Sequence, residues 1–579
     1  MNLRNIIKKD FQRTLNKNYD LCKIDPLIIS NKKTNAGHYQ LHNLIKISNI
    51  LKIKPYTVFL TITKNFQNKK IYKKLSFSEP GFINILINQE WLSQQLEKIF
   101  SSPRLDIDYV SSKNIIIDYS SPNIAKEMHI GHLRSTIIGD VSARVLSFLG
   151  HNVIRVNHIG DWGTQFGMLI AYLNNHNITD SLYKNKISLS QLEQFYCKAK
   201  KKYESNASFS EEARKYVKKL QHGDQHCLSI WKKLVSITML QNNKIYNMLN
   251  VTLNNNHIMG ESTYNSMLPK IIQDLKQKNI AVECNKSIVV FLNDFKNRLG
   301  EPMGVIIQKK DQGFLYSTTE IACLKYRYQT LHADRIIYYT DVRQKQHLIQ
   351  SWIIAKKANY IPKNLSLEHH TFGMVLSKNK RPFKTRDGNT IKLSALLNES
   401  IARTTKIIKQ KQPNLPKKKL VILAKKIGIS AVKYADLSKN RNTNYIFNWD
   451  DMLSLEGNTA PYIQYAYTRI ISIIKKSTIP IKKIKEKIIL SKKNEIDLAI
   501  QILEFEEIIL LISKKGTPHV MCKYLYQLAT CFSNFYENCP ILFSKKIKTC
   551  KSRLKLSFLT AKTLKKGLNL LGITTIQRM

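Results

Sequence analysis

Acidic residues and long apolar runs are both scarce in this chain of 579 residues. Asp and Glu number 41 against 92 Lys and Arg, which leaves a formal net charge of +51. No apolar run approaches the roughly 18–20 residues that a bilayer-spanning helix needs. The first residues lack the apolar segment and small-residue cleavage site of a secretory signal. These absences predict a cytoplasmic protein with no membrane association.

Paired cysteines are absent as well. The nine cysteines are scattered, and no two have CxxC spacing. This distribution argues against a zinc knuckle or a dithiol redox site and indicates reduced thiols, so no structural zinc and no other metal site is expected.

The excess of Lys and Arg has two explanations. Clustered cations neutralise phosphates and release counterions, which favours a nucleic-acid partner. Compositional drift is the alternative, because Lys, Asn and Ile are abundant together throughout the chain. The charge alone does not distinguish tRNA from DNA, the ribosome or a membrane.

The length predicts roughly three to four domains. Residues 1–105 mix helical and extended patterns, as in the strand-like run at 82–87 that passes into an amphipathic helix. Further strand-like runs begin at residues 287, 304 and 335, and after about residue 395 only helical patterns remain. We therefore expect an N-terminal α+β domain, an α/β core and an all-α C-terminal third.

The core begins with a strand–helix–strand pattern. Residues 114–118 form an apolar run typical of a buried strand. A helix is predicted from His129 to Leu149, ended by Gly150, and a second strand over 152–158. This βαβ unit predicts a doubly wound, parallel Rossmann-type sheet.

His129, Gly131 and His132 lie at the start of the predicted helix, after the loop that follows the first strand. Ligands of doubly wound sheets bind at that edge, and two imidazoles at a helix N-terminus suit phosphate oxygens. Gly131 would let a nucleotide approach the backbone closely. A zinc-binding His pair is the alternative, but no further ligand lies nearby at metal spacing. The motif predicts an ATP site.

The residues around this motif closely resemble the arginyl-tRNA synthetases, a family of class I aminoacyl-tRNA synthetases, of the bacterial type. The resemblance runs through Asp118–Asp140 (DYSSPNIAKEMHIGHLRSTIIGD). It continues in order through residues 160–167, 260–262, 315–322, 373–376, 383–386 and 456–469.

The resemblance implies an arginine pocket. Glu261, Tyr316 and Glu320 would face the guanidinium, and Asp118, Ser121, Asn123 and Gln344 would line the pocket and hold the α-amino end. Paired acceptors suit this task, because Arg presents a rigid fork of donors and Lys does not. The family usually has Asp at the position of Glu320, so the carboxylate here is displaced by one methylene.

A second departure concerns the phosphate loop. Class I enzymes usually carry a Lys-Met-Ser-Lys loop, whereas this chain has Phe-Lys-Thr-Arg at 383–386. The resemblance assigns ATP binding to His129, Gly131, His132, Lys384 and Arg386. It also implies that Lys126, just before the histidine motif, compensates for the altered loop, so that Lys126, Lys384 and both histidines are the predicted catalytic residues.

The implied reaction has two displacements. The arginine carboxylate attacks the α-phosphorus of ATP, with Mg²⁺ neutralising the pyrophosphate, and the terminal ribose of tRNA(Arg) then attacks the activated carbonyl. The family further implies that tRNA binds before activation, and that the enzyme is a monomer.

Tyrosines in the C-terminal third are candidates for RNA contact, since unstacked bases lie on aromatic faces. The resemblance implies that residues 455–579 form an anticodon-binding helical domain, with Tyr462, Tyr465, Arg469 and Met579 at the tRNA. Core packing is the alternative use of these tyrosines. Residues 1–105 would contact the tRNA elbow, 110–395 would form the catalytic domain, and 396–454 a helical connector.

Two other function classes remain open at this point. Small nucleotidylyltransferases also use His-x-Gly-His, but they are short chains without the helical tail. A non-catalytic RNA-binding relative would share the charge and the tyrosines, although both histidines are intact here.

Overall fold

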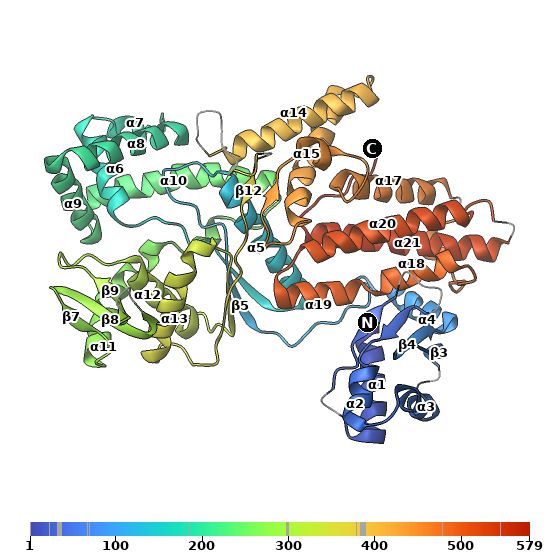
Figure 1. Ribbon diagram of the computed structural model, residues 1–579. Helices are drawn as coiled ribbons and strands as arrows, with labels where there is room; N and C mark the ends of the chain where they lie inside the picture. Colours follow the sequence, from blue (N-terminus) through green and yellow to red (C-terminus); the bar gives the residue numbers. More distant parts are fainter. Residues whose placement is uncertain are drawn as a thin grey trace.

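The structure is a computed structural model that describes residues 2–21, 24–31, 37–66, 68, 70–184, 186–296, 300–377, 379–381, 390–477, 479–544 and 546–578. Figure 1 shows an elongated molecule, with two lobes on the left, a bundle of helices on the right and the N-terminal domain below that bundle. Among the described residues, no helix has the length and apolar character needed to cross a bilayer.

The N-terminal domain is α+β, as predicted. Its antiparallel sheet has the order β1-β2-β4-β3. The strands are β1 (Ile28–Ser30), β2 (Tyr39–Leu41), β3 (Tyr72–Ser78) and β4 (Phe82–Ile87), and the helices are α1 (Leu3–Tyr19), α2 (Leu44–Leu51), α3 (Pro55–Asn65) and α4 (Gln89–Ser101). The predicted passage from strand to helix is found at β4 and α4, where Asn88 caps α4 by accepting from the Glu90 amide.

The central sheet is fully parallel, with the order β11-β10-β5-β6. It contains β5 (Asn114–Asp118), β6 (Asn152–Val156), β10 (Arg335–Tyr338) and β11 (Ser366–His369). The strand order reverses between β5 and β10, and this is the edge at which parallel sheets bind ligands. The predicted parallel, Rossmann-type core is confirmed.

Helix α5 (Ile130–Leu149) joins β5 to β6 and ends as predicted. Gly150 stands at its C-terminus with φ +100°, in the left-handed region that glycine tolerates best. The helix is buried nearly all around. It packs against α14, α15, α19 and α21, so α5 joins the central sheet to the C-terminal helices.

Two insertions follow β6. The first is helical and contains α6 (Thr164–Asn175), α7 (Thr179–Tyr183), α8 (Leu189–Ser205), α9 (Ala207–Gln221) and α10 (Gln225–Met248). The second contains α11 (Leu268–Gln277), β7 (Val282–Cys284), β8 (Ser287–Lys296) and β9 (Pro302–Gln308). Helix α12 (Tyr316–Gln329) then leads into β10, and α13 (Lys345–Lys357) joins β10 to β11. The strand-like runs at 287 and 304 are strands, but they form a separate antiparallel sheet with β7 and not part of the parallel core.

The C-terminal part is a stack of helices, with one correction to the sequence-based expectation. Its helices are α14 (Leu393–Lys411), α15 (Lys417–Leu437), α16 (Trp449–Leu453), α17 (Ala460–Lys476), α18 (Lys493–Leu503), α19 (Phe505–Lys515), α20 (His519–Asn538) and α21 (Ile547–Leu570). The expectation that strands end near residue 395 is wrong, because β13 (Tyr445–Ile446) pairs with β12 (Val375–Leu376). Two backbone pairs are too short to produce a period-2 pattern.

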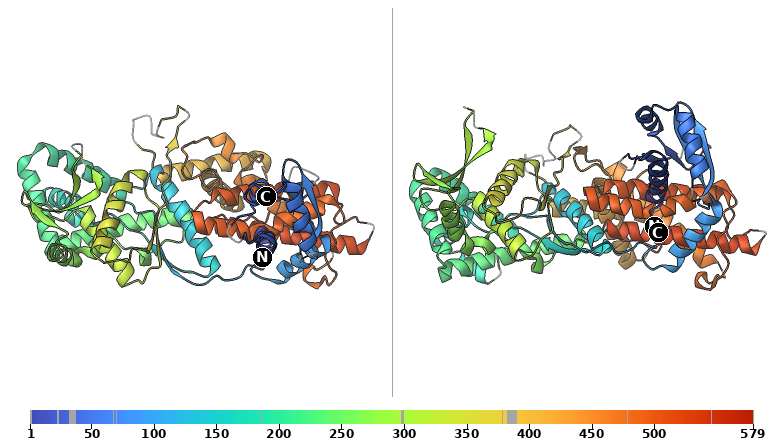
Figure 2. Two further views of the ribbon diagram at one scale, coloured as in Figure 1. Left: turned by 60° about the horizontal axis from the view of Figure 1, so that its bottom comes forward. Right: turned by 90° about the horizontal axis from the view of Figure 1, so that it is seen from below.

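The N-terminal domain packs against the C-terminal helices. Figure 2 shows the N-terminal domain against the C-terminal helices in both views. Helix α4 packs on α18 and α21, and the Lys555 ammonium lies 2.7 Å from the Glu97 carboxylate. Lys555 is buried and also donates to the Glu486 carbonyl at 2.8 Å. A buried lysine is stable only with such partners, so this contact joins the two domains firmly.

Candidate active site

The loop that precedes α5 is held in a strained conformation. Ser120, Ser121 and Ala125 all have positive φ, between 47° and 74°. Each backbone amide donates to a side chain from another element: Ser120 to Ser135, Ser121 to Asn157 and Ala125 to Thr238. Non-glycine residues keep such angles only where surrounding contacts enforce them, and such strain concentrates at functional sites.

His129 and His132 lie ring against ring at the N-terminus of α5. The Nδ1 atom of His129 accepts from the Gly131 amide, and that of His132 from the His129 amide, both at 3.1 Å. Their ring centroids are 4.0 Å apart. A Cβ at position 131 would lie 2.8 Å from the His129 ring, so glycine is required here by the histidine itself.

Both imidazoles are neutral at pH 7. Burial, and then the charges of Lys126 and Arg343, lower the pKa of His129. Burial and the neighbouring His129 lower the pKa of His132 to about 3. Because each Nδ1 accepts a hydrogen bond, the proton of each ring is on Nε2, where it can be donated to an oxygen of a ligand.

Lys126 contacts helix α8. Its ammonium lies 4.4 Å from the centroid of the Tyr196 ring. Lys384 and Arg386 lie outside the described residues. The segment after them does return to the site, since Ile130 donates to the Ile391 carbonyl at 3.0 Å and Leu393 to the Met128 carbonyl at 2.9 Å.

A group of carboxylates lies at the carboxyl end of β5 and beyond it. Asp118, at that end, accepts from the Arg327 guanidinium at 2.5 Å and from Ser121 at 3.0 Å. Arg327 is fully buried on α12. The Asp118 charge is therefore balanced inside the protein, and Ser121 orients its second oxygen.

Glu320 and Glu261 form no such ion pair among the described residues. Glu320 is 1% exposed, and its Oε1 atom has no hydrogen-bond partner among the described residues. Burial and the charges of Asp161 and Glu320 raise the pKa of Glu261 to about 7. Burial and Glu320 likewise raise the pKa of Tyr338, whose hydroxyl also lacks a partner in the described chain. Buried acceptors without donors indicate a place for a cation.

The remaining residues of the predicted arginine pocket are more exposed. Tyr316 begins α12 and is 36% exposed, and its ring meets His347 at 6.3 Å. Asn123 is exposed and pairs with Gly160, where a Cβ would come within 2.7 Å of its amide oxygen. Gln344 is exposed in the short turn after β10.

The separate sequence blocks meet in space. Asp161 accepts from the amide and hydroxyl of Ser262, at 3.0 and 2.6 Å. The Glu261 amide donates to the Ile159 carbonyl at 3.2 Å. Residues 159–161 therefore hold the segment that carries Glu261.

Sequence reasoning missed Arg327, Tyr338 and Tyr196. Arg327 was detectable, because it follows Glu320 by seven residues and lies on the same face of a helix. Tyr338 ends a strand beside β5, a position that only the strand order reveals.

The C-terminal candidates divide into exposed and buried residues. Tyr465 is 46% exposed. Tyr462 and Arg469 share its face of α17 at helical spacing, and the Arg469 guanidinium lies 4.6 Å from the centroid of the Tyr536 ring on α20. Tyr467 and Tyr524 are buried and belong to the core. Met579 lies outside the described residues. Gln464 on α17 donates a hydrogen bond to the Thr574 carbonyl at 2.8 Å.

Comparison with known proteins agrees with this arrangement. The catalytic-domain model of class I tRNA synthetases (R) matches residues 95–449. The arginyl-tRNA synthetase N-terminal domain matches residues 2–87, and the DALR anticodon-binding domain matches residues 463–579. The chain belongs to the arginyl-tRNA synthetase family.

Individual relatives cover all or nearly all of the chain. An arginine–tRNA ligase of Buchnera aphidicola subsp. Acyrthosiphon pisum (strain Tuc7) is 70% identical over 579 residues, all of both chains. That of Serratia proteamaculans (strain 568) is 54% identical over 94% of each chain. The arginyl-tRNA synthetase structure from Plasmodium falciparum is 33% identical, covers 100% of this chain and 99% of its own, and has a TM-score of 0.86.

Family membership excludes one of the function classes that the sequence left open. A small nucleotidylyltransferase is excluded, because the match includes the N-terminal and anticodon-binding domains as well as the catalytic one.

Proposed function

We propose that Glu261 and Glu320 hold the guanidinium of arginine while His129 and His132 hold ATP. The chain activates L-arginine to arginyl-adenylate and transfers it to the 3′ end of tRNA(Arg), releasing AMP and diphosphate. The observation that carries this proposal is the buried Glu320 oxygen without a donor among the described residues, with the Glu261 carboxyl close enough for its pKa to be raised by Glu320.

The charge balance of the pocket fits arginine. Asp118, Glu261 and Glu320 are three carboxylates, and the Arg327 guanidinium neutralises one of them. A second guanidinium would supply donors to the remaining two acceptors. Lysine would satisfy fewer of them, because its ammonium is a point charge on a flexible stem and has no planar fork.

The more exposed residues hold the other end of the amino acid. Asn123 and Gln344 are exposed amides at the carboxyl ends of β5 and β10 and bind the α-amino group. Tyr316 closes the pocket over the aliphatic part, while Asp118 and Ser121 line its floor. The arginine carboxylate is then directed toward the N-terminus of α5.

ATP lies along that N-terminus. The Nε2 protons of both histidines donate to phosphate oxygens, and the missing side chain at Gly131 leaves His129 in place. Mg²⁺ bound to ATP would supply further positive charge at its phosphates. Lys126, together with Lys384 and Arg386, offsets the charge that develops as the carboxylate attacks the α-phosphorus and diphosphate leaves.

The tRNA contacts the helical region. Tyr462, Tyr465 and Arg469 present rings and a guanidinium on one face of α17, and Met579 is the fourth residue assigned to tRNA binding. Residues 455–579 bind the anticodon, 396–454 connect them to the catalytic residues 110–395, and 1–105 reach the tRNA elbow. The enzyme acts as a cytoplasmic monomer.

Exchange of pyrophosphate into ATP tests the activity. With saturating tRNA(Arg), exchange should depend on arginine and not on lysine or citrulline, since citrulline has the shape of arginine without its charge. Exchange driven equally by citrulline would contradict the charge-based pocket. No exchange with any amino acid would instead support a non-catalytic RNA-binding relative.

A further inference from the structure

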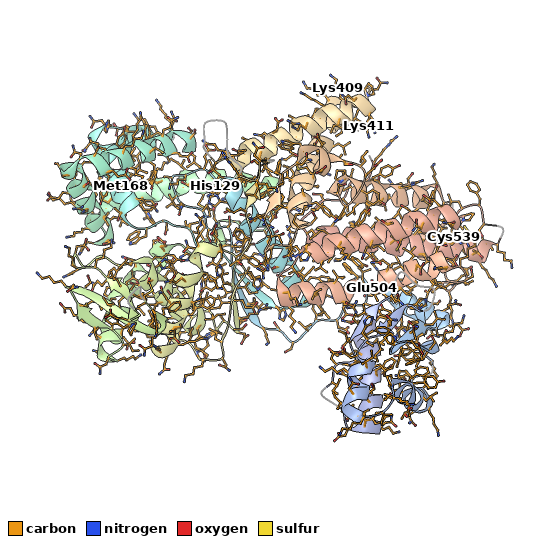
Figure 3. The ribbon with its side chains drawn as sticks, viewed as in Figure 1. His129, Met168, Lys409, Lys411, Glu504 and Cys539 are labelled. Carbon is orange, nitrogen blue, oxygen red and sulfur yellow. The ribbon has the colours of Figure 1, made fainter. Side chains whose placement is uncertain are left out.

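Helix α8 contacts the loop between β5 and α5, which carries Lys126, through one aromatic ring. Tyr196 is half-buried on α8, and the Lys126 ammonium lies 4.4 Å from its ring centroid. Among the described residues, no carboxylate lies within 4.0 Å of that ammonium. Figure 3 shows His129 in the region where the insertion that carries α8 meets the helices after the core.

A ring is a suitable partner for a cation that must later meet phosphate. A carboxylate would neutralise Lys126 and compete with ATP by a strong, charge-assisted hydrogen bond. The face of a tyrosine attracts an ammonium more weakly and leaves its charge in place. Tyr196 therefore limits where the ammonium can lie without removing the charge that the reaction needs.

A second contact fixes α8 in this position. Glu193 lies one turn before Tyr196 on the same face of α8, 3.2 Å from the Lys392 ammonium. Lys392 also lies 2.8 Å from Glu127, the neighbour of Lys126. Its backbone pairs with His129. The insertion is thus joined through Lys392 to Glu127 and His129, which lie on either side of Met128. This connection keeps Tyr196 next to Lys126.

We propose that Tyr196 is a positioning residue for adenylate formation, holding the Lys126 ammonium beside the histidine pair for the phosphates of ATP. This proposal rests on the role of Lys126 given above. No described contact requires the Tyr196 hydroxyl, so the aromatic face is the functional part.

A double-mutant cycle in arginine-dependent pyrophosphate exchange tests this role. Tyr196→Leu should lower kcat roughly threefold to tenfold, the range of one cation–π contact, with the KM for arginine unchanged. Tyr196→Phe should keep the wild-type rate, and Tyr196→Met should repeat the loss. In the Lys126→Met background, Tyr196→Leu should have no further effect.

The insertion offers a matched control. Tyr216 on α9 carries the Lys219 ammonium 5.5 Å from its ring centroid, away from the loop, and Tyr216→Leu should leave kcat unchanged. The proposal is overturned if Tyr196→Phe is as slow as Tyr196→Leu, if the loss persists in the Lys126→Met background, or if Lys126→Met equals the wild type. Failure of the overall function would look different, because the wild type itself would then show no arginine-dependent exchange.

Discussion

The proposed arginine pocket, with the carboxylates Asp118, Glu261 and Glu320, differs in burial and in charge from the face of α17 that carries Tyr465. The pocket gathers three acidic residues in a chain with a net charge of +51, and Glu320 is almost completely buried. On α17, Tyr465 is exposed and its neighbours include Arg469. The C-terminal end of α14 is also basic, since Figure 3 shows Lys409 and Lys411 there.

The difference follows from the size and charge of the two ligands. A small cation is selected by desolvated acceptors that are costly to leave unpaired. A large polyanion is bound by exposed cations and rings, each of which contributes little and tolerates change. Substitutions should therefore be severe in the pocket and milder on α17.

The largest effect is expected at Glu320. Glu320→Gln removes the buried charge that faces the guanidinium, and kcat/KM for arginine should fall roughly 30-fold to a few thousandfold. Steady-state exchange measures this, and Glu283→Gln, at an exposed glutamate of β7, serves as the control. A loss below threefold would contradict the role of Glu320.

The second-largest effect is expected for Lys126→Met. Loss of one group that stabilises charge in the transition state slows chemistry roughly a hundredfold. Single-turnover formation of arginyl-adenylate should show this loss, while the Kd for tRNA measured by filter binding stays near the wild-type value. Equal losses in both measurements would mean that Lys126 serves RNA binding or folding.

Tyr465→Ala tests the exposed face of α17 as a tRNA contact. Loss of one stacked base should raise the KM for tRNA roughly fivefold to a hundredfold, with the KM for arginine unaffected. Tyr465→Phe keeps the ring and should behave as the wild type in aminoacylation. If Tyr465→Ala charges tRNA normally, the exposed face of α17 is not the contact.

The smallest effect concerns pH. Burial and the nearby carboxylates raise the pKa of Glu261 to about 7, so this group is mostly neutral at pH 6 and charged at pH 8. The KM for arginine should therefore fall roughly fivefold to tenfold as the pH rises from 6 to 8. Glu261→Gln should flatten this dependence, and an unchanged profile in that variant would assign the titration to another group.

The sequence by itself determined the local elements and the family. Apolar runs, the i, i+4 face of α5 and Gly150 predict the strand–helix–strand unit, because these signals depend on neighbours along the chain. The blocks from Asp118 to Arg469 indicate the family for the same reason. The placement of Tyr462, Tyr465 and Arg469 on one helix also follows from spacing alone.

Only the tertiary structure decided which charges are balanced and which are free. Asp118 and Glu320 are both acidic residues of one predicted pocket, yet Arg327 neutralises the first and nothing described bonds to Oε1 of the second. The assignment of β7–β9 to a separate sheet, and the approach of Tyr196 to Lys126, likewise join residues far apart in sequence. Such pairings depend on how elements pack, which no local pattern records.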